Sequence, residues 1–168
     1  MPRSLGLTAE SPASVEQFHA AFSDEAYWRA RLAVNDSGAT SLDALDVGDD
    51  GRVEVAMTLR PLGDHFPRLI TQFQRGDLKI VHTEQWRWTG DGKMSGQVKF
   101  VVSGIPLSGL GALMLAPTVS GSLLSGTATV EVRVPLVGGT IERFIGGHLP
   151  DGIVMTERFT TEWIAAHG

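Results

Sequence analysis

Residues 140–168 read TIERFIGGHLPDGIVMTERFTTEWIAAHG, and this stretch decides the fold because it is the only long amphipathic helix that the chain can form. Its apolar residues recur at helical spacing on one stripe, made of Ile141, Ile145, Leu149, Met155, Phe159 and Trp163. Polar residues lie opposite, at Glu142, Arg143, Arg158 and Thr161. Because Pro150 cannot donate the backbone hydrogen bond at its position, we expect a kink near His148.

The segments before this helix have the period of antiparallel strands. In the most regular of them, one face carries Leu78, Ile80, His82, Glu84, Trp86 and Trp88. Similar patterns predict strands over residues 42–47, 53–60, 97–103, 106–115 and 127–134. The turns at Gly48–Gly51 and Gly90–Gly92 are typical of hairpins, and we expect another turn over residues 117–121.

The amino-terminal part predicts a short strand over residues 4–9, followed by two short helices. Ser14 stands three residues before Gln17, which is the spacing of a capping box at the start of a helix. Ser23-Asp24-Glu25 then predicts the cap of the second helix, with its carboxylates at the positive end. The segment 64–75 has helical spacing and predicts a further short helix between two strands.

This order of elements predicts a cavity. A single helix is about 10 Å wide, whereas a sheet of six or seven strands is roughly 30 Å across. One helix cannot cover such a sheet if the sheet stays flat, so the sheet must curl around the helix and leave space between them. We therefore expect residues 1–168 to form a single α+β domain, a curved antiparallel sheet around a long C-terminal helix.

The same element order resembles the START-like, or SRPBCC, superfamily of helix-grip proteins, which includes the birch-pollen-allergen proteins and polyketide cyclases. The most specific segments are residues 14–18 with Tyr27-Trp28, residues 81–86, and residues 134–142. They are similar to one uncharacterised branch, known only as a domain of unknown function. The resemblance implies a fold and a pocket for an apolar ligand, and it implies no particular reaction or catalytic residue.

Composition excludes several other classes of function. The net charge is −5, and lysine and arginine are scattered, so we expect no nucleic-acid partner. The chain has no cysteine, and its histidines lack metal-ligand spacing, so we expect neither a metal site nor a cofactor. Residues 107–119 are the most apolar stretch but are too short and too glycine-rich to span a bilayer, and residues 1–7 lack the apolar run that a secretory signal requires. We expect a cytoplasmic protein.

His82 and Glu84 are the best candidates for a functional site, because they share a strand face with Trp86. A buried carboxylate is costly unless it is paired, and paired buried carboxylates often mark sites. The alternative is that both residues lie at the wet rim or bind only backbone. His148 falls on the inner stripe of the last helix near Gly152, but both could instead belong to a helix break at Gly146–Pro150.

Large apolar side chains complete the candidate ligand-binding set, namely Trp86, Trp88, Phe100, Met155 and Phe159. Side chains of this kind are equally typical of an ordinary core. Phe66, Leu69 and Phe73, on the helix expected over residues 64–75, are candidates for a gate at the pocket mouth or for a patch over the end of the sheet.

Three functions remain from the sequence. The first is the binding or carriage of a hydrophobic small molecule or lipid in the cavity. The second is an enzyme of the cyclase or dehydratase type, in which His82, Glu84 or His148 moves protons on a bound polyketide-like or aromatic substrate. The third is a protein-interaction module, which requires a collapsed interior and an exposed apolar patch.

Overall fold

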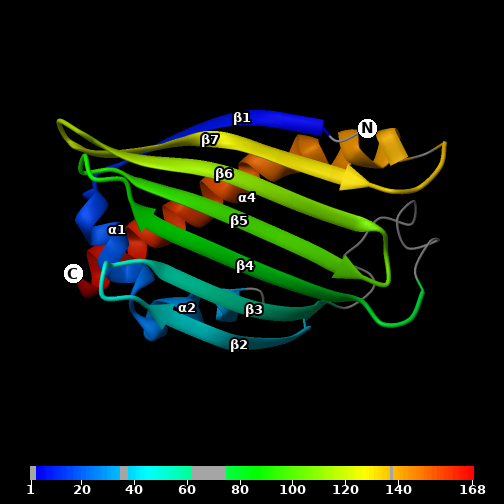
Figure 1. Ribbon diagram of the computed structural model, residues 1–168, viewed down its shortest axis with the longest axis horizontal. Helices are drawn as coiled ribbons and strands as arrows, with labels where there is room; N and C mark the ends of the chain where they lie inside the picture. Colours follow the sequence, from blue (N-terminus) through cyan, green and yellow to red (C-terminus); the bar gives the residue numbers. More distant parts are fainter. Residues whose placement is uncertain (1–2, 35–37, 62–74, 137) are drawn as a thin grey trace.

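The protein folds as a seven-stranded antiparallel sheet that holds one long helix against one of its faces (Figure 1). The computed structural model describes residues 3–34, 38–61, 75–136 and 138–168. The elements in chain order are β1 (Arg3–Ser11), α1 (Val15–Phe22), α2 (Glu25–Val34), β2 (Gly38–Val47), β3 (Val53–Pro61), β4 (Lys79–Trp88), β5 (Met94–Ser103), β6 (Leu107–Thr118), β7 (Gly121–Val132) and α4 (Gly138–His167). The order, and the two short helices after the first strand, confirm the predicted α+β architecture.

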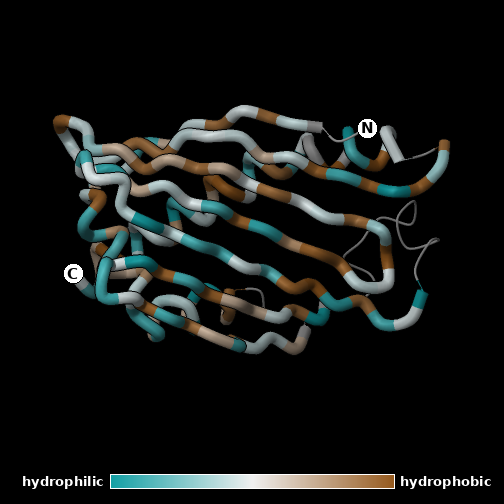
Figure 2. The backbone as a smooth tube through the Cα atoms, in the orientation of Figure 1, coloured by the Kyte–Doolittle hydropathy of each residue, from teal (hydrophilic) through white to brown (hydrophobic). Residues whose placement is uncertain are grey.

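The strands follow one another across the sheet in the order β1-β7-β6-β5-β4-β3-β2, and every neighbouring pair is antiparallel. Apolar and polar residues succeed one another along the strands (Figure 2). In β6, for example, Leu107, Leu113 and Leu115 are buried while Leu110 faces outward. The alternation places one apolar face of the whole sheet toward α4.

The turn between β6 and β7 is shorter than expected. We predicted a turn over residues 117–121, but β6 continues to Thr118 and β7 already begins at Gly121. Pro117 pairs with Ser122 close to the end of the hairpin. Proline has no backbone N–H to donate. It is tolerated at this position because the ladder of hydrogen bonds is close to its end.

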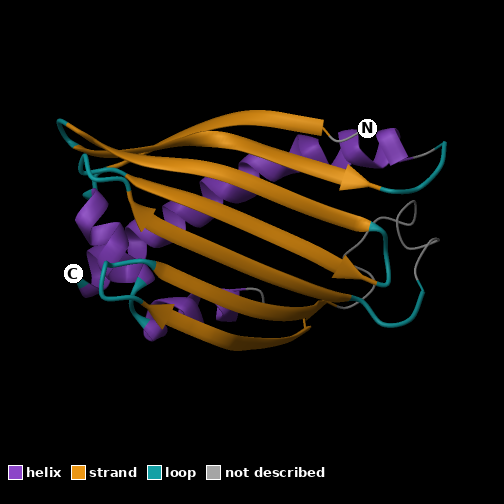
Figure 3. Ribbon diagram, viewed as in Figure 1, coloured by secondary structure: helices purple, strands orange, loops and turns teal. Residues whose placement is uncertain are grey.

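Helix α4 crosses the sheet diagonally and packs mainly on β1 and β7 (Figure 3). It runs as one helix through Pro150, so the break considered at Gly146–Pro150 does not occur. Its first turns are fixed by Ile141, which is buried, and by Glu142, whose Oε2 accepts a 2.8 Å hydrogen bond from the backbone N–H of Val132. The contact joins the start of the helix to the end of β7.

The short helices close the opposite end of the sheet. Ser14 caps α1 as predicted: its hydroxyl accepts from the Gln17 backbone, and the Gln17 side chain accepts from the Ser14 backbone. Ser23, however, ends α1 and does not begin α2. Its hydroxyl donates to the His19 carbonyl, and Asp24 accepts from the Ala26 backbone N–H at the start of α2.

The apolar interior has two parts, and the candidate site lies between them. One part contains Phe18, Phe22, Tyr27 and Trp28 at the α1–α2 end, and the other contains Ile141 near the start of α4. The expected helix over residues 64–75, with Phe66, Leu69 and Phe73, lies almost entirely outside the described residues. None of the described helices is long and apolar enough to cross a membrane.

Candidate functional site

A cavity of about 260 Å³ lies between the sheet and α4. Most of its wall is apolar and comes from the sheet and from α4, including Val98, Leu113, Leu115, Leu124, Ala128 and Ile153. Aromatic rings of Phe18, Phe22 and Trp86 close the end nearest the short helices. The hollow predicted from the widths of sheet and helix is therefore present.

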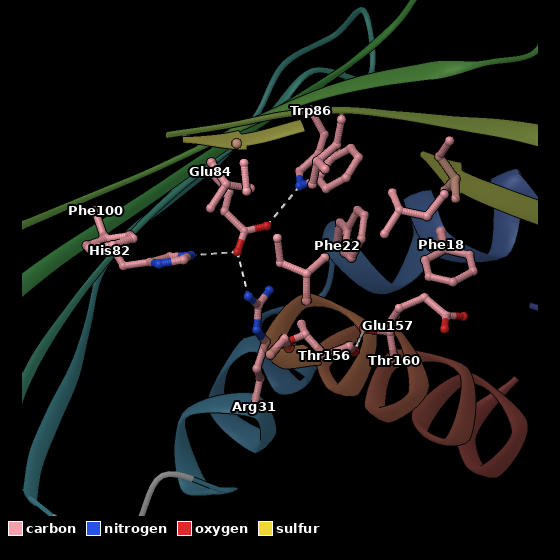
Figure 4. A pocket seen from close by; sticks show the side chains of 18 of the residues that line it. Phe18, Phe22, Arg31, His82, Glu84, Trp86, Phe100, Thr156, Glu157 and Thr160 are labelled. Carbon is pink, nitrogen blue, oxygen red and sulfur yellow. Dashed lines mark hydrogen bonds and ion pairs between the residues drawn. The ribbon is translucent and has the colours of Figure 1, made fainter. Parts of the chain in front are cut away.

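The sheet wall of the cavity carries a carboxylate that is almost completely enclosed. Glu84 on β4 is 4% exposed. Its Oε2 lies 2.7 Å from a guanidinium nitrogen of Arg31 and 2.7 Å from Nε2 of His82. Its Oε1 accepts a 3.0 Å hydrogen bond from the indole N–H of Trp86. Three nitrogen groups from α2 and β4 thus converge on one buried carboxylate (Figure 4).

Arg31 is held on several sides. Its guanidinium lies over the Trp28 ring, 5.0 Å from the ring centroid, and 2.7 Å from Oε2 of Glu84. The Tyr27 hydroxyl lies 2.6 Å from Oγ1 of Thr160, which itself donates to the Thr156 carbonyl, so Tyr27 donates to Thr160. The Tyr27–Thr160 bond therefore links α2 to α4, while Arg31–Glu84 links α2 to the sheet.

The electrostatics of this cluster keep Glu84 ionised. Burial alone would raise the pKa of Glu84, but the Arg31 guanidinium and the hydrogen bonds from His82 and Trp86 hold it well below its usual range. Burial would likewise lower the pKa of Arg31, but the Glu84 carboxylate raises it above its ordinary value. Glu84 cannot accept a proton near neutral pH, so its chemical role is to hold Arg31 and to orient the ring of His82.

The helix wall carries a second buried carboxylate with very different partners. Glu157 on α4 is 8% exposed and lines the same cavity. Its Oε1 accepts a 2.9 Å hydrogen bond from the Thr161 hydroxyl, and Thr161 lies 2.6 Å from the hydroxyl of Ser11 on β1. Among the described residues no lysine or arginine pairs with Glu157.

The structure brings four of the predicted site residues together at the cavity wall: His82, Glu84, Trp86 and Phe100. Trp88 lies outside it and packs against His19, with the ring centroids 5.2 Å apart. Phe159 and Met155 line an adjoining hollow bounded by α2, β3, β4 and α4, which shares Arg31, His82, Gly152 and Thr156 with the cavity.

Three predicted residues on α4, namely His148, Met155 and Phe159, do not line the cavity. Met155 is 68% exposed and His148 is exposed as well. In this half of the helix Thr160 and Ile164 are buried and Ile153 is half-buried on the same face, next to the buried Glu157. At ~100° per residue, Met155 lies about 160° around the helix from the centre of that face. The predicted stripe combined residues from two different faces.

Several residues at the site were missed in the sequence, namely Arg31, Tyr27, Glu157 and Thr160, whereas Gly152 lines the cavity as the sequence had suggested. Tyr27 and Arg31 are four residues apart, so their shared helix face was a usable signal. Glu157 lies four residues after Ile153 and seven before Ile164, which places it near the inward face. Within the described chain, no group of three or more His, Asp or Glu residues could hold a metal ion.

A family model described as "Protein of unknown function (DUF2505)" matches residues 7–164, nearly the whole chain. The chain belongs to this family. An uncharacterised protein of Mycobacterium tuberculosis strain H37Rv is 36% identical over 171 residues, covering 98% of both chains. An uncharacterised protein of Mycobacterium bovis matches to the same extent. The family membership confirms the predicted uncharacterised branch.

Solved structures similar to this DUF2505 chain share its fold at low identity. Ara h 8.0201 has a TM-score of 0.61 at 7% identity, covering 99% of this chain and all of its own. Norcoclaurine synthase from Thalictrum flavum, solved in complex with dopamine and hydroxybenzaldehyde, has a TM-score of 0.56 at 13% identity, covering 100% of this chain and 89% of its own. The DUF2505 chain thus shares the helix-grip fold of these structures, as predicted.

Proposed function

We propose that the protein binds a hydrophobic small molecule or lipid in the cavity between the sheet and α4. The supporting observation is the cavity itself, about 260 Å³ enclosed mainly by apolar side chains. An apolar cavity of ~150 Å³ is enough to bind benzene. The volume here therefore suits a ligand of roughly ten non-hydrogen atoms. A filled interior, which the interaction-module hypothesis required, is not what the described residues form.

The apolar wall also sets the scale of affinity. Each buried methylene contributes about 0.8 kcal/mol, so a chain of about eight carbons gains about 6 kcal/mol. That free energy corresponds to a Kd of tens of micromolar, roughly 40 μM. Binding should therefore be measured with ligands at tens to hundreds of micromolar.

Filling the cavity tests the proposal. Gly111 lies on the inward face of β6, and a Cβ there would meet its neighbours at ordinary contact distances, so Gly111→Leu adds a side chain into the cavity. Gly6 on β1 is exposed and does not line the cavity, which makes Gly6→Leu a matched control. We expect eight-carbon ligands to bind the wild type and Gly6→Leu, and to lose affinity at least about ten-fold in Gly111→Leu, measured by native mass spectrometry. Equal binding by all three proteins would place the ligand elsewhere.

A second candidate function is acid–base catalysis on the bound molecule. One observation favours it: Nε2 of His82 lies 2.7 Å from Glu84, and both residues line the cavity. Glu84 would orient the imidazole while His82 transfers the proton. His148 takes no part in this arrangement, because it does not line the cavity. Turnover of a bound compound that disappears in His82→Gln, with binding retained, would support this candidate.

A further inference from the structure

The formal charges of the side chains that line the cavity do not sum to zero. Arg31 and Glu84 pair at 2.7 Å and neutralise each other. Glu157 lines the same cavity, and none of the described lysine or arginine side chains lies within ion-pair distance of it. With His82 counted as neutral, the cavity wall therefore carries one uncompensated negative charge. A buried carboxylate without a cation is costly, so a ligand that supplies the cation gains affinity.

The hydroxyl groups around Glu157 show which of its oxygens is available. The Ala13 backbone N–H donates to Oγ of Ser11 at 3.1 Å, so the Ser11 hydroxyl is free to donate to Thr161 at 2.6 Å. Thr161 in turn donates to Oε1 of Glu157 at 2.9 Å. Every donor in this chain is directed toward Glu157. No described residue donates to its second oxygen, Oε2, which is left for a ligand in the cavity.

The surroundings of Glu157 favour the binding of a cation. The surroundings of Arg31 do not favour the binding of an anion. Figure 4 shows the Glu157 carboxylate on the α4 side of the cavity near Phe18, apart from the cluster of Glu84, Arg31 and His82. Aromatic faces such as Phe18 and Phe22 attract ammonium groups. Arg31 already donates to Glu84, and an added carboxylate there would lie beside Glu84 and be repelled.

We propose that the ligand is a cationic amphiphile, whose ammonium group pairs with Glu157 while an apolar body of roughly ten non-hydrogen atoms fills the cavity. This inference rests on the proposed binding function and specifies its ligand class. The ammonium would donate to Oε2 of Glu157, and the apolar body would lie along the leucine-rich wall formed by β6 and β7. The same cavity would discriminate against an acid of equal length.

Three ligands with the same eight-carbon chain test the inference: n-octylamine, n-octanol and n-octanoic acid, titrated near pH 7 by isothermal calorimetry. We expect n-octylamine to bind about ten-fold or more tightly than n-octanol, and n-octanoic acid to bind most weakly. In Glu157→Gln the preference for the amine should disappear while n-octanol binding stays the same. Glu162→Gln removes the same charge from an exposed position on the same helix and should keep the preference.

The outcomes separate this inference from the function on which it rests. Equal binding of amine and alcohol by the wild type would overturn the ligand class while leaving hydrophobic binding intact. Tightest binding of the acid would also overturn it, and would assign the head group to Arg31. If none of the three ligands bound, the binding function itself would be wrong. Circular dichroism of Glu157→Gln ensures that a lost preference does not come from unfolding.

Discussion

The two walls of the cavity each hold a buried glutamate, and the two are satisfied in opposite ways. Glu84 on the sheet is 4% exposed and Glu157 on α4 is 8% exposed, so burial hardly distinguishes them. Glu84 has a guanidinium, an imidazole and an indole as partners, whereas Glu157 has one hydroxyl. The comparison teaches that the partners of a buried charge, more than its depth, indicate whether it serves the fold or a ligand.

The sheet-side cluster ties three elements together. Arg31 connects α2 to β4 through Glu84, and Tyr27 connects α2 to α4 through Thr160. Removing Glu84 would leave the largely buried Arg31 without its counter-charge. The helix-side carboxylate accepts from one hydroxyl, that of Thr161 on α4, which Ser11 on β1 contacts in turn, and no described residue donates to its Oε2. Its removal should disturb the fold much less.

We therefore expect the largest difference between variants at the two glutamates in their free energies of unfolding. Glu84→Gln leaves Arg31, whose side chain is 19% exposed, without its counter-charge, and breaking a largely buried pair in this way costs up to about 3–5 kcal/mol. Glu157→Gln removes a charge that has no cationic partner among the described residues, and we expect a change of about 1 kcal/mol or less. Equilibrium urea unfolding measures both free energies of unfolding.

A double variant provides the control for this comparison. In Arg31→Met/Glu84→Leu both charges are absent, so no unpaired charge stays buried. We expect it to be more stable than Glu84→Gln by about 1–3 kcal/mol, because an apolar replacement of a whole pair is often tolerated. If the double variant is the less stable of the two, the cost does not come from an unpaired charge, and the assigned role of Glu84 is wrong.

Acidification should produce a smaller effect of the same origin. The pKa of Glu84 in the folded protein lies well below its usual range. In the unfolded chain it is about 4.3, so below about pH 5 the unfolded state binds a proton that the folded state does not. The free energy of unfolding should therefore fall as the pH drops from about 5 toward 3, and this fall should be shallower in Glu84→Gln. Urea titrations at several pH values check the slopes.

Much of the fold could be predicted because it depends on local periodicity. The alternation in residues 78–88 placed His82, Glu84 and Trp86 on one face, and the structure keeps all three at the cavity. The cavity followed from the mismatch in width between sheet and helix. Neither inference needed to know which elements touch.

The partners of the site could not be predicted, because they depend on tertiary packing. The sequence does not indicate that Arg31 of α2 lies next to Glu84, although Tyr27 and Arg31 share a helix face. The predicted stripe on α4 included Met155 and excluded Glu157, because a helical wheel does not say which sector of a long helix a curved sheet will cover. The exposed Met155 is the consequence.

The last comparison uses one hydroxyl from the Arg31–Glu84 side of the cavity and one from the Glu157 side. Tyr27→Phe removes a fully buried hydroxyl that donates to Thr160, so Thr160 loses its partner. We expect a loss of about 1.5–3 kcal/mol. Thr161→Val removes the donor to Glu157, but the cavity is large enough for a water-sized molecule to reach that carboxylate, so the loss should be about 1 kcal/mol or less. Thr161→Ser keeps the hydroxyl and should match the wild type. A larger loss in Thr161→Val than in Tyr27→Phe would mean that Glu157 is structural, and would remove the distinction between the two walls.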